Sequence, residues 1–523
     1  MSFLTKVQSA GIATLLLSMS IFLSRCIGLI RDKLISWNFG ATTETDIYFI
    51  AFIIPDFINY LLAGGYFSII LVPLLTKYFA QGEREGYRFF STILTTVTLT
   101  IIFLTIVLWY YTPYLVPYIA KNLQGEDYDR LTLFIRIILP GQIFFLSGAV
   151  LSALLYMRKQ FLVPALMPLI YNTSIIIFGL LISSDGMIGY CYGVTIGAFF
   201  GAFLLPLYAV IKGGIDYSFT VRHKGCIAFL ILALPLMLGQ SITMLEEQFI
   251  RIFGSYLSHG VVSVLSYARR IMLLPVGVVA QAIGVASYPF LTSMITSGKK
   301  EEFISTLRSA LNNTLYFLIP LTIFMILMSE QIVAILFYGG EFTFSFVIAT
   351  TPLLQFLLMG VPAWGIQQVL VRGFYAHNDT IKPTIVGTLV TGVSIVFYYY
   401  GIEYCDAIGV ALASTLAITL YMFVLCIVWR VWYYKGVLNG LFSTFIITSI
   451  EVLPASVLIY VLSPYVFDIL SLYFSEAYFW GNVLSLLFYG IVFGSAYFVT
   501  LLLTKSPRYA FFYSLLRRVL GSR

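Results

Sequence analysis

Two arginines lie inside one apolar stretch near the start of the chain. Arg25 and Arg31 belong to the segment SRCIGLIRD (24–32), and apolar sequence surrounds it from about Gly11 to Trp37. A run of that length can cross a bilayer, which takes roughly 20 residues. An arginine at the bilayer centre costs about 2.5–3.5 kcal/mol on insertion scales unless it meets water or a partner. The two residues therefore indicate a functional position, and their charge favours an anionic ligand.

A helix over this segment would spread its polar atoms over one broad face. Ser24 and Arg31 fall on one stripe of that face. Arg25 and Asp32 fall on a second stripe, with Gly28 between the two arginines. At 1.5 Å per residue, Arg25 and Arg31 are separated by about 9 Å along the axis. This pattern predicts the lining of a cavity. The alternative is a structural pair of Arg31 with Asp32, or a pair between helices.

A second pair of arginines, Arg269 and Arg270, lies in the apolar segment 261–292. If the helix begins near Val261, Arg270 lies close to the membrane midplane. Arginine suits a phosphate ligand because its planar fork donates two hydrogen bonds and stays charged. Together with the first segment, Arg270 predicts a central cationic cavity. For Arg269 the alternative is a side chain that snorkels to the outer surface.

Acidic residues accompany these arginines. Glu247 and Arg251 have i, i+4 spacing with the acid first, which is a favourable helical pair. Glu246 is left over, so the group is either a self-neutralising ion pair or a carboxylate linked to a proton or cation. Asp46 opens the next predicted helix after the first arginine segment, where it can cap that helix or pair with Arg31.

The composition indicates a polytopic membrane protein. The 523 residues are 60% hydrophobic and 10% charged, whereas a soluble chain has about 25% charged residues. The net charge of +7 is attributed to basic cytoplasmic loops rather than to nucleic-acid binding. The five cysteines are scattered, and the HExxH, GxSxG and P-loop patterns do not occur. Neither an enzyme, a metal site nor a cofactor is therefore expected.

Apolar segments predict about fourteen transmembrane helices. Basic and acidic loops alternate along the chain, so the basic side is expected to be cytoplasmic. An even number of helices then places both termini in the cytoplasm. Breaks inside the longer segments are expected at Pro55, Gly64-Gly65, Pro140-Gly141 and Pro275. The predicted segments are 10–37, 45–79, 89–118, 131–156, 162–183, 187–211, 227–257, 261–292, 303–328, 346–371, 384–400, 407–429, 440–463 and 480–504.

Two landmarks recur at one offset. Pro55 and Pro275 are 220 residues apart (275 − 55), and Pro164 and Pro383 are 219 apart (383 − 164). This spacing predicts two homologous lobes, as in many secondary transporters. The expected fold is therefore an all-α integral membrane protein with two pseudo-symmetric six-helix lobes and two further helices. The predicted parts are 1–220 (helices 1–6), 221–435 (helices 7–12) and 436–523 (helices 13–14 and a basic tail).

A set of short motifs is spread over residues 10–430. They are Ser24-Arg25, Gly28 and Arg31-Asp32; Phe39-Gly40-Ala41; Thr45-Asp46; Pro55; Val72-Pro73; Pro164-Ala165, Pro168 and Asn172; Tyr267-Ala268, Arg270 and Pro275; Gly373-Phe374-Tyr375; and Lys382-Pro383. This set resembles the lipid II flippase family MurJ (MviN) of the MOP exporter superfamily. The resemblance implies a transporter that moves a lipid-linked peptidoglycan precursor from the inner to the outer leaflet of the bacterial cytoplasmic membrane. The implied partners are that polyprenyl-diphosphate lipid, membrane lipids and the cell-wall synthesis machinery, with the protein as a monomer and no nucleic acid.

The resemblance implies that Arg25, Arg31 and Arg270 are the cavity arginines and that Asp46 is the family's aspartate. The predicted substrate-binding set also includes Ser24, Gly28, Asn59 and Arg269, with Glu246, Glu247 and Arg251 as a coupling or structural group. The chain departs from the family at three positions. Asn59 and Gly64 stand where an arginine and a glutamate are expected, and Tyr398 stands where some members have the asparagine of a sodium site. The alternative function is a related exporter of another lipid-linked oligosaccharide (O-antigen type) or of a drug, although a cationic drug requires an acidic cavity.

Overall fold

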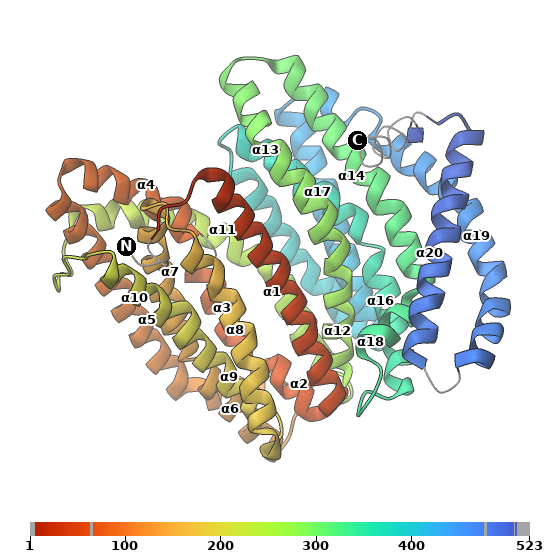
Figure 1. Cartoon of the computed structure of the whole chain (residues 1–523), viewed down its shortest axis with the longest axis horizontal. Helices are drawn as coiled ribbons and strands as arrows, with labels where there is room; N and C mark the ends of the chain where they lie inside the picture. The colour runs from red at the N-terminus through yellow and green to blue at the C-terminus, as the bar shows by residue number, and fades with distance from the viewer. Residues whose placement is uncertain (1–5, 63–65, 475–477, 507, 510–523) are drawn as a thin grey trace. The chain divides into compact units, whose positions relative to one another are not determined.

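The computed structural model describes residues 6–62, 66–474, 478–506 and 508–509. These residues form helices joined by short loops, and the only extended pairing among them is one isolated bridge between Gly339 and Phe342 (Figure 1). The chain divides into two compact units. The first unit is Met1–Ser263 with Gly339–Phe342, and the second is Val264–Tyr338 with Thr343–Arg523.

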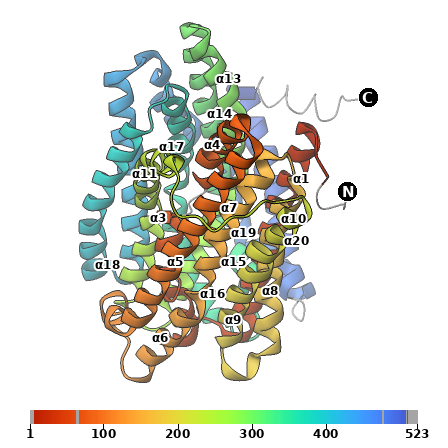
Figure 2. The same cartoon turned by 90° about the vertical axis from the view of Figure 1, so that its left-hand side faces the viewer.

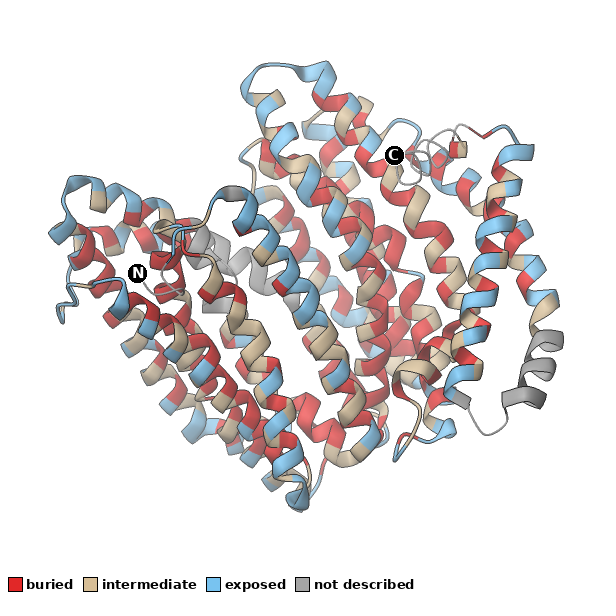
Figure 3. Cartoon of the chain, in the orientation of Figure 1, coloured by how far each residue is buried: buried red, intermediate tan, exposed pale blue. Residues whose placement is uncertain are grey.

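The first unit packs its helices around a core of aliphatic and aromatic side chains. Leu71, Leu75, Phe89 and Leu151 are fully buried in that core, which joins α4, α5 and α7. In contrast, α1 packs against α8, and most of its residues up to Ile30 are exposed or partly buried (Figures 2 and 3). The elements are α1 (Ala10–Phe39), α2 (Thr43–Ile50), α3 (Ile53–Leu62), α4 (Tyr66–Gln81), α5 (Glu83–Ile119), α6 (Glu126–Ile138), α7 (Gly141–Met157), α8 (Leu162–Leu181), η2 (Ser183–Asp185), α9 (Ile188–Gly197), η3 (Ala198–Leu204), α10 (Leu205–Lys212) and α11 (Lys224–Gly254).

The helices of the first unit end near some, but not all, of the predicted breaks. The predicted single segment 45–79 is divided into α2, α3 and α4, and the first break falls at Ala51–Phe52 rather than at Pro55. Gly64-Gly65 lies outside the described residues. Pro140 separates α6 from α7, as predicted, because proline cannot donate the hydrogen bond that would continue the helix.

The second unit has its core between α14, α17 and α18, where Phe303, Phe374 and Trp429 are fully buried. Its first helix, α12, begins in the first unit and ends at Pro275, where a π-helical turn continues the path. The elements are α12 (Val261–Pro275), η4 (Val276–Ala280), α13 (Gln281–Thr296), α14 (Lys300–Leu327), α15 (Ser329–Phe337), α16 (Phe344–Leu358), α17 (Val361–Ala376), α18 (Ile381–Trp432), η5 (Lys435–Leu438), α19 (Leu441–Phe474) and α20 (Tyr478–Leu503).

The long element α18 turns back on itself. Asp406 has a non-helical backbone with φ 47° and ψ −130°. On either side of it, Gly401 and Gly409 approach so closely that a Cβ on Gly409 would lie 1.8 Å from the Gly401 carbonyl oxygen. Farther along, the Tyr421 hydroxyl donates to the Pro383 carbonyl at 3.0 Å. The two arms correspond to the predicted segments 384–400 and 407–429.

Among the described residues, ten helices are long and apolar enough to cross a membrane, or eleven if the bent pair α16–α17 forms one span. The protein is therefore an all-helical, multi-pass membrane protein, and the number fourteen stays a prediction. The predicted and observed numbers differ partly because α18 is counted as one span. They also differ because only the described parts of α11 and of α3–α4 are included in the count. The predicted lobe boundaries also stay a prediction. The chain divides into its compact units between residues 263 and 264, whereas the first predicted boundary lies between 220 and 221. The helix α11 belongs to the first unit because it packs on α3, α4 and α5.

Candidate substrate-binding site

The open face of α1, which we define as Ser24, Arg25 and Gly28, is the most accessible polar surface of the predicted site. Arg25 is exposed, and Ser24 and Gly28 are partly buried. A Cβ built on Gly28 would meet no atom within 4 Å. Open space therefore lies at Gly28, about one helical turn from Arg25, in the segment where the sequence predicted a cavity lining.

Arg31 is held by two partners in the same unit. Its Nε and Nη2 donate to Asp32 Oδ1 at 3.0 and 2.8 Å, and its Nη1 donates to Asn172 Oδ1 at 3.0 Å. Asp32 is only 2% exposed. The pairing of Arg31 with Asp32, which the sequence left as the structural alternative, is thus present. A residue in this position fixes α1 to α8 and has few donors left for a ligand.

Asn172 connects Arg31 to the open face. Its Nδ2 donates to Ser24 Oγ at 3.2 Å and to the Pro168 carbonyl at 3.0 Å, while its Oδ1 receives Arg31. Asn172 is buried on α8, and the sequence indicated it only as part of a motif. The signal that could have identified it is a buried amide one turn after a proline in an apolar helix, since such a polar group needs partners.

Asp46 neither caps its own helix nor pairs with Arg31, so both expectations for it were wrong. The carboxylate is 4% exposed and accepts from the backbone of Gly260 at 2.5 Å and of Ser263 at 2.7 Å. It also accepts from the Ser263 hydroxyl at 2.5 Å. These donors form the first turn of α12, whose N–H groups have no partners within the helix. Asp46 is therefore the N-terminal cap of α12, although it lies more than 200 positions earlier in the chain than this helix.

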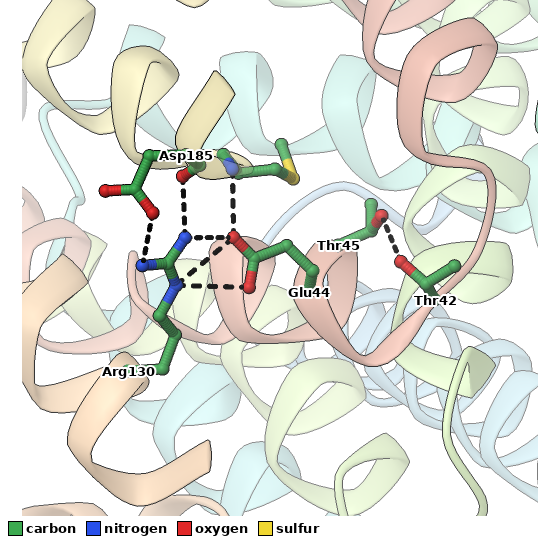
Figure 4. A network of polar contacts seen from close by, with 6 residues as sticks. Thr42, Glu44, Thr45, Arg130 and Asp185 are labelled. Carbon is green, nitrogen blue, oxygen red and sulfur yellow. Dashed lines mark hydrogen bonds and ion pairs between the residues drawn. The ribbon is translucent and has the colours of Figure 1, made fainter. Parts of the chain in front are cut away.

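Two residues earlier on α2, Glu44 belongs to a second network (Figure 4). Arg130 Nη2 of α6 donates to Glu44 Oε1 at 2.8 Å and to the Asp185 carbonyl at 2.7 Å. Glu44 Oε1 also accepts from the Met187 backbone at 2.9 Å. Glu44 and Asp46 together fix α2 to the ends of α6, η2 and α9 and to the start of α12.

Gly186 packs directly against this network, and its replacement is expected to destabilise the protein. A Cβ there would lie 2.4 Å from Glu44 Oε1, and the backbone φ is +61°. Gly186→Ala should lower the free energy of unfolding by about 1–3 kcal/mol, measured as a lower melting temperature in detergent. Gly125→Ala is the matched control, because Gly125 has a φ of +53° but open space around its Cβ. Equal losses in the two variants would mean that the contact with Glu44 has no effect.

The Glu247–Arg251 pair is present as predicted, with Nη2 to Oε1 at 2.7 Å. Arg251 Nη1 also donates to Asp56 Oδ2 of α3 at 2.8 Å and to Gln248 Oε1 at 3.3 Å. Two carboxylates thus face one buried guanidinium group. Asp56 precedes Asn59 by one helical turn, so Arg251 brings no net positive charge to the position where the family arginine is expected.

In the second unit, the side chains of Arg269 and Arg270 differ in burial. Arg269 is 8% exposed, and its Cζ lies 5.7 Å from the centre of the Trp364 ring. It stacks inside the unit, so it does not snorkel to a surface. Arg270 is partly exposed. Of the two, Arg270 is therefore the more accessible to a ligand.

A family model described as lipid II flippase MurJ matches residues 35–489 of the chain. The chain belongs to this family. The lipid II flippase MurJ of Thermosipho africanus is 28% identical over 411 residues, covering 77% of this chain and 82% of the relative. The probable lipid II flippase MurJ of Buchnera aphidicola subsp. Schizaphis graminum is 27% identical over 456 residues, covering 85% and 86%.

Solved structures agree with membership of the MurJ family. A lipid II flippase MurJ in an inward closed conformation has a TM-score of 0.77 and 26% identity, covering 93% of this chain and 100% of that one. An inward-facing multidrug resistance MATE transporter of the MOP superfamily has a TM-score of 0.66 at 15% identity, which shows a shared fold only. The MurJ resemblance inferred from the sequence is therefore confirmed.

Proposed function

We propose that this chain moves lipid II, a lipid-linked peptidoglycan precursor, from the inner to the outer leaflet of the bacterial cytoplasmic membrane. The observation that carries the proposal is the open face of α1, where an exposed arginine adjoins open space in a chain of the MurJ family. A diphosphate is the part of the substrate that a guanidinium group recognises best, through two parallel hydrogen bonds. The second candidate, export of a cationic drug, would need an acidic surface at this position.

The residues divide into contact and positioning roles. Arg25 and Arg270 are the phosphate contacts, and Ser24 and Gly28 border the head group. Arg31 positions this face through Asp32 and Asn172. We assign Asp46 and Arg269 to holding α12, because both are buried, and Asn59 to a polar border without charge. Glu247 and Arg251 form a structural ion-pair group with Asp56, and Glu246 stays a proposed coupling or structural residue.

The membrane potential can supply the driving force. Each uncompensated negative charge gains about 2.3 kcal/mol per 100 mV when it moves outward across an inside-negative membrane. A diphosphate head is therefore exported by the potential, provided that the arginines stay in place. We further propose that both termini are cytoplasmic, that the protein acts as a monomer, and that it delivers its lipid to the cell-wall synthesis machinery.

The direct test uses vesicles that contain the purified protein and a fluorescent lipid II analogue. We expect the protein to increase transfer of the analogue between leaflets, and a potassium diffusion potential to accelerate transfer toward the positive side. The protein should also rescue a flippase-depleted bacterium. Unchanged transfer relative to protein-free vesicles would contradict the proposal. Faster transfer of an O-antigen lipid than of lipid II would favour the related exporter instead.

Blocking the open face of α1 should stop transport without unfolding the protein. Gly28→Leu places a bulky side chain in the space beside Arg25, at a steric cost to a bound ligand of about 1–3 kcal/mol, or roughly 5- to 150-fold in rate. The vesicle assay measures this loss. Gly11→Leu on the same helix is the control, since a Cβ at Gly11 also meets nothing within 4 Å. Similar rates in the two variants would mean that the substrate does not occupy this space.

A further inference from the structure

The second unit contains a buried ion pair between α19 and the tail that follows α20. Arg508 Nη1 donates to Glu451 Oε1 at 2.8 Å, and the two side chains are only 5% and 6% exposed. Glu451 lies in α19, within the apolar stretch Lys435–Ser463 that is long enough to span a membrane. Arg508 belongs to the tail that follows α20. Burying an ionisable pair in such a stretch costs free energy, which indicates that the pair has a structural or functional role.

The end of α20 turns Arg508 back toward the helices. Lys505 has a φ of +50°, its N–H donates to the Leu502 carbonyl at 3.2 Å, and the Ser506 N–H donates to the Leu501 carbonyl at 3.0 Å. This is the hydrogen-bond pattern of a Schellman cap, which reverses the chain after a helix. The Tyr509 ring then lies 5.2 Å from that of Phe498, one turn back on α20. The reversal is therefore a fixed feature of the tail.

The ion pair joins three elements of the second unit. The Arg508 Cζ lies 5.1 Å from the centre of the Tyr316 ring on α14, Glu451 comes from α19, and Ser506 Oγ on the tail accepts from Arg508 Nη1 at 3.4 Å. Within the described part of the chain, Glu451 has no other hydrogen-bond donor. Each charge thus depends on the other for compensation, and separating them would leave both in an apolar surrounding.

We infer that Glu451 and Arg508 form a clasp by which the tail of α20 holds α19 and α20 on α14. The two helices pack on each other and α19 packs on α14, and the buried side chains of α19 include the aliphatic Val452 and the small Ala455. In a membrane such contacts gain little over contacts with lipid. The clasp adds a bond that lipid cannot replace, so it decides where the helix pair sits.

The clasp has a consequence for the middle of α19. Ile459, Tyr460 and Ser463 form the α19 wall of an open pocket that is also lined by Glu330 and Gln355. Ile459 is buried on the same face as Glu451, two turns farther along the helix. Loosening the clasp should displace this wall. Glu451 and Arg508 are therefore positioning residues, and their effect on transport rests on the function proposed above.

The test measures helix attachment separately from transport. Phe324 of α14 and Phe493 of α20 have ring centres 5.2 Å apart, so the F324C/F493C pair reports on the position of α20. The full chain is used in membranes, with its five native cysteines replaced by serine. Arg508→Met should lower crosslinking at least about tenfold, because Glu451 loses its partner charge. Arg508→Lys, which keeps the positive charge, should retain most of the crosslinking.

The decisive variant is the double replacement Glu451→Met with Arg508→Met. Removing both charges should restore crosslinking and transport to within about twofold of the parent, since an apolar pair needs no compensation. The F144C/F203C pair in the first unit, with ring centres 5.9 Å apart, should crosslink equally in every variant. Crosslinking unchanged in Arg508→Met, or a double variant as poor as the single one, would overturn the clasp. Absence of transport in the parent itself would overturn only the proposed function.

Discussion

Arg25→Ala should lose most transport while the protein stays folded. Arg25 is exposed on α1 beside the open space at Gly28, so its removal creates no cavity in a packed core. The expected loss is that of a hydrogen bond to a charged group, about 1.5–3 kcal/mol, or roughly 10- to 150-fold in rate. The vesicle assay gives the rate, and the melting temperature in detergent should change by little.

Three variants make this prediction specific. Arg25→Lys keeps the charge but lacks the planar fork, so an intermediate rate is expected. Arg88→Ala removes an exposed arginine elsewhere in the unit and should leave transport unchanged. Arg31→Ala should instead destabilise the protein, by about 3–5 kcal/mol, because the buried Asp32 loses its guanidinium partner. If Arg25→Ala and Arg31→Ala lost stability equally, the division into contact and positioning roles would be wrong.

Asp46→Ala should destabilise the protein strongly. Its carboxylate accepts from two backbone N–H groups and one hydroxyl at the first turn of α12, all of them buried. An alanine leaves these three donors without that acceptor and removes a negative charge from the positive end of a helix. Losing these three charge-assisted hydrogen bonds would cost about 3 kcal/mol or more. The measurement is thermal unfolding in detergent, together with the yield of folded protein.

The controls for Asp46 separate charge from geometry. Asp46→Asn keeps one acceptor oxygen and should fall between the parent and the alanine variant. Asp129→Ala removes an exposed acid from the first turn of α6 and should cost only a few tenths of a kcal/mol, the scale of an exposed dipole contact. An alanine variant as stable as the parent would show that the hydrogen bonds to Gly260 and Ser263 do not hold α12.

The features that the sequence predicted well are local in the chain. The Glu247–Arg251 pair follows from i, i+4 spacing. The turn inside α18 follows from the interruption of the apolar sequence between residues 400 and 407. Helical, multi-pass architecture follows from composition alone. These features need only the period of the helix and the thickness of the membrane.

The contacts that the sequence did not predict join residues that are far apart in the chain. Asp46 was expected to cap its own helix, yet its partners are at Gly260 and Ser263. Asp56 and Asn172 were not considered as partners, although each completes the hydrogen bonding of an arginine. A period of 3.6 residues tells which face of a helix a residue occupies but not which helix it meets. Only the packing of the helices supplies that partner.

We expect the open face of α1 to bind a lipid-linked diphosphate, and equilibrium binding tests this most directly. The affinity of the purified protein for a short-chain polyprenyl diphosphate would be compared with its affinity for the matching monophosphate. The parent should prefer the diphosphate, and Arg25→Ala should lose that preference together with roughly tenfold or more in affinity. Equal affinities of the parent and Arg25→Ala for both lipids would contradict the account.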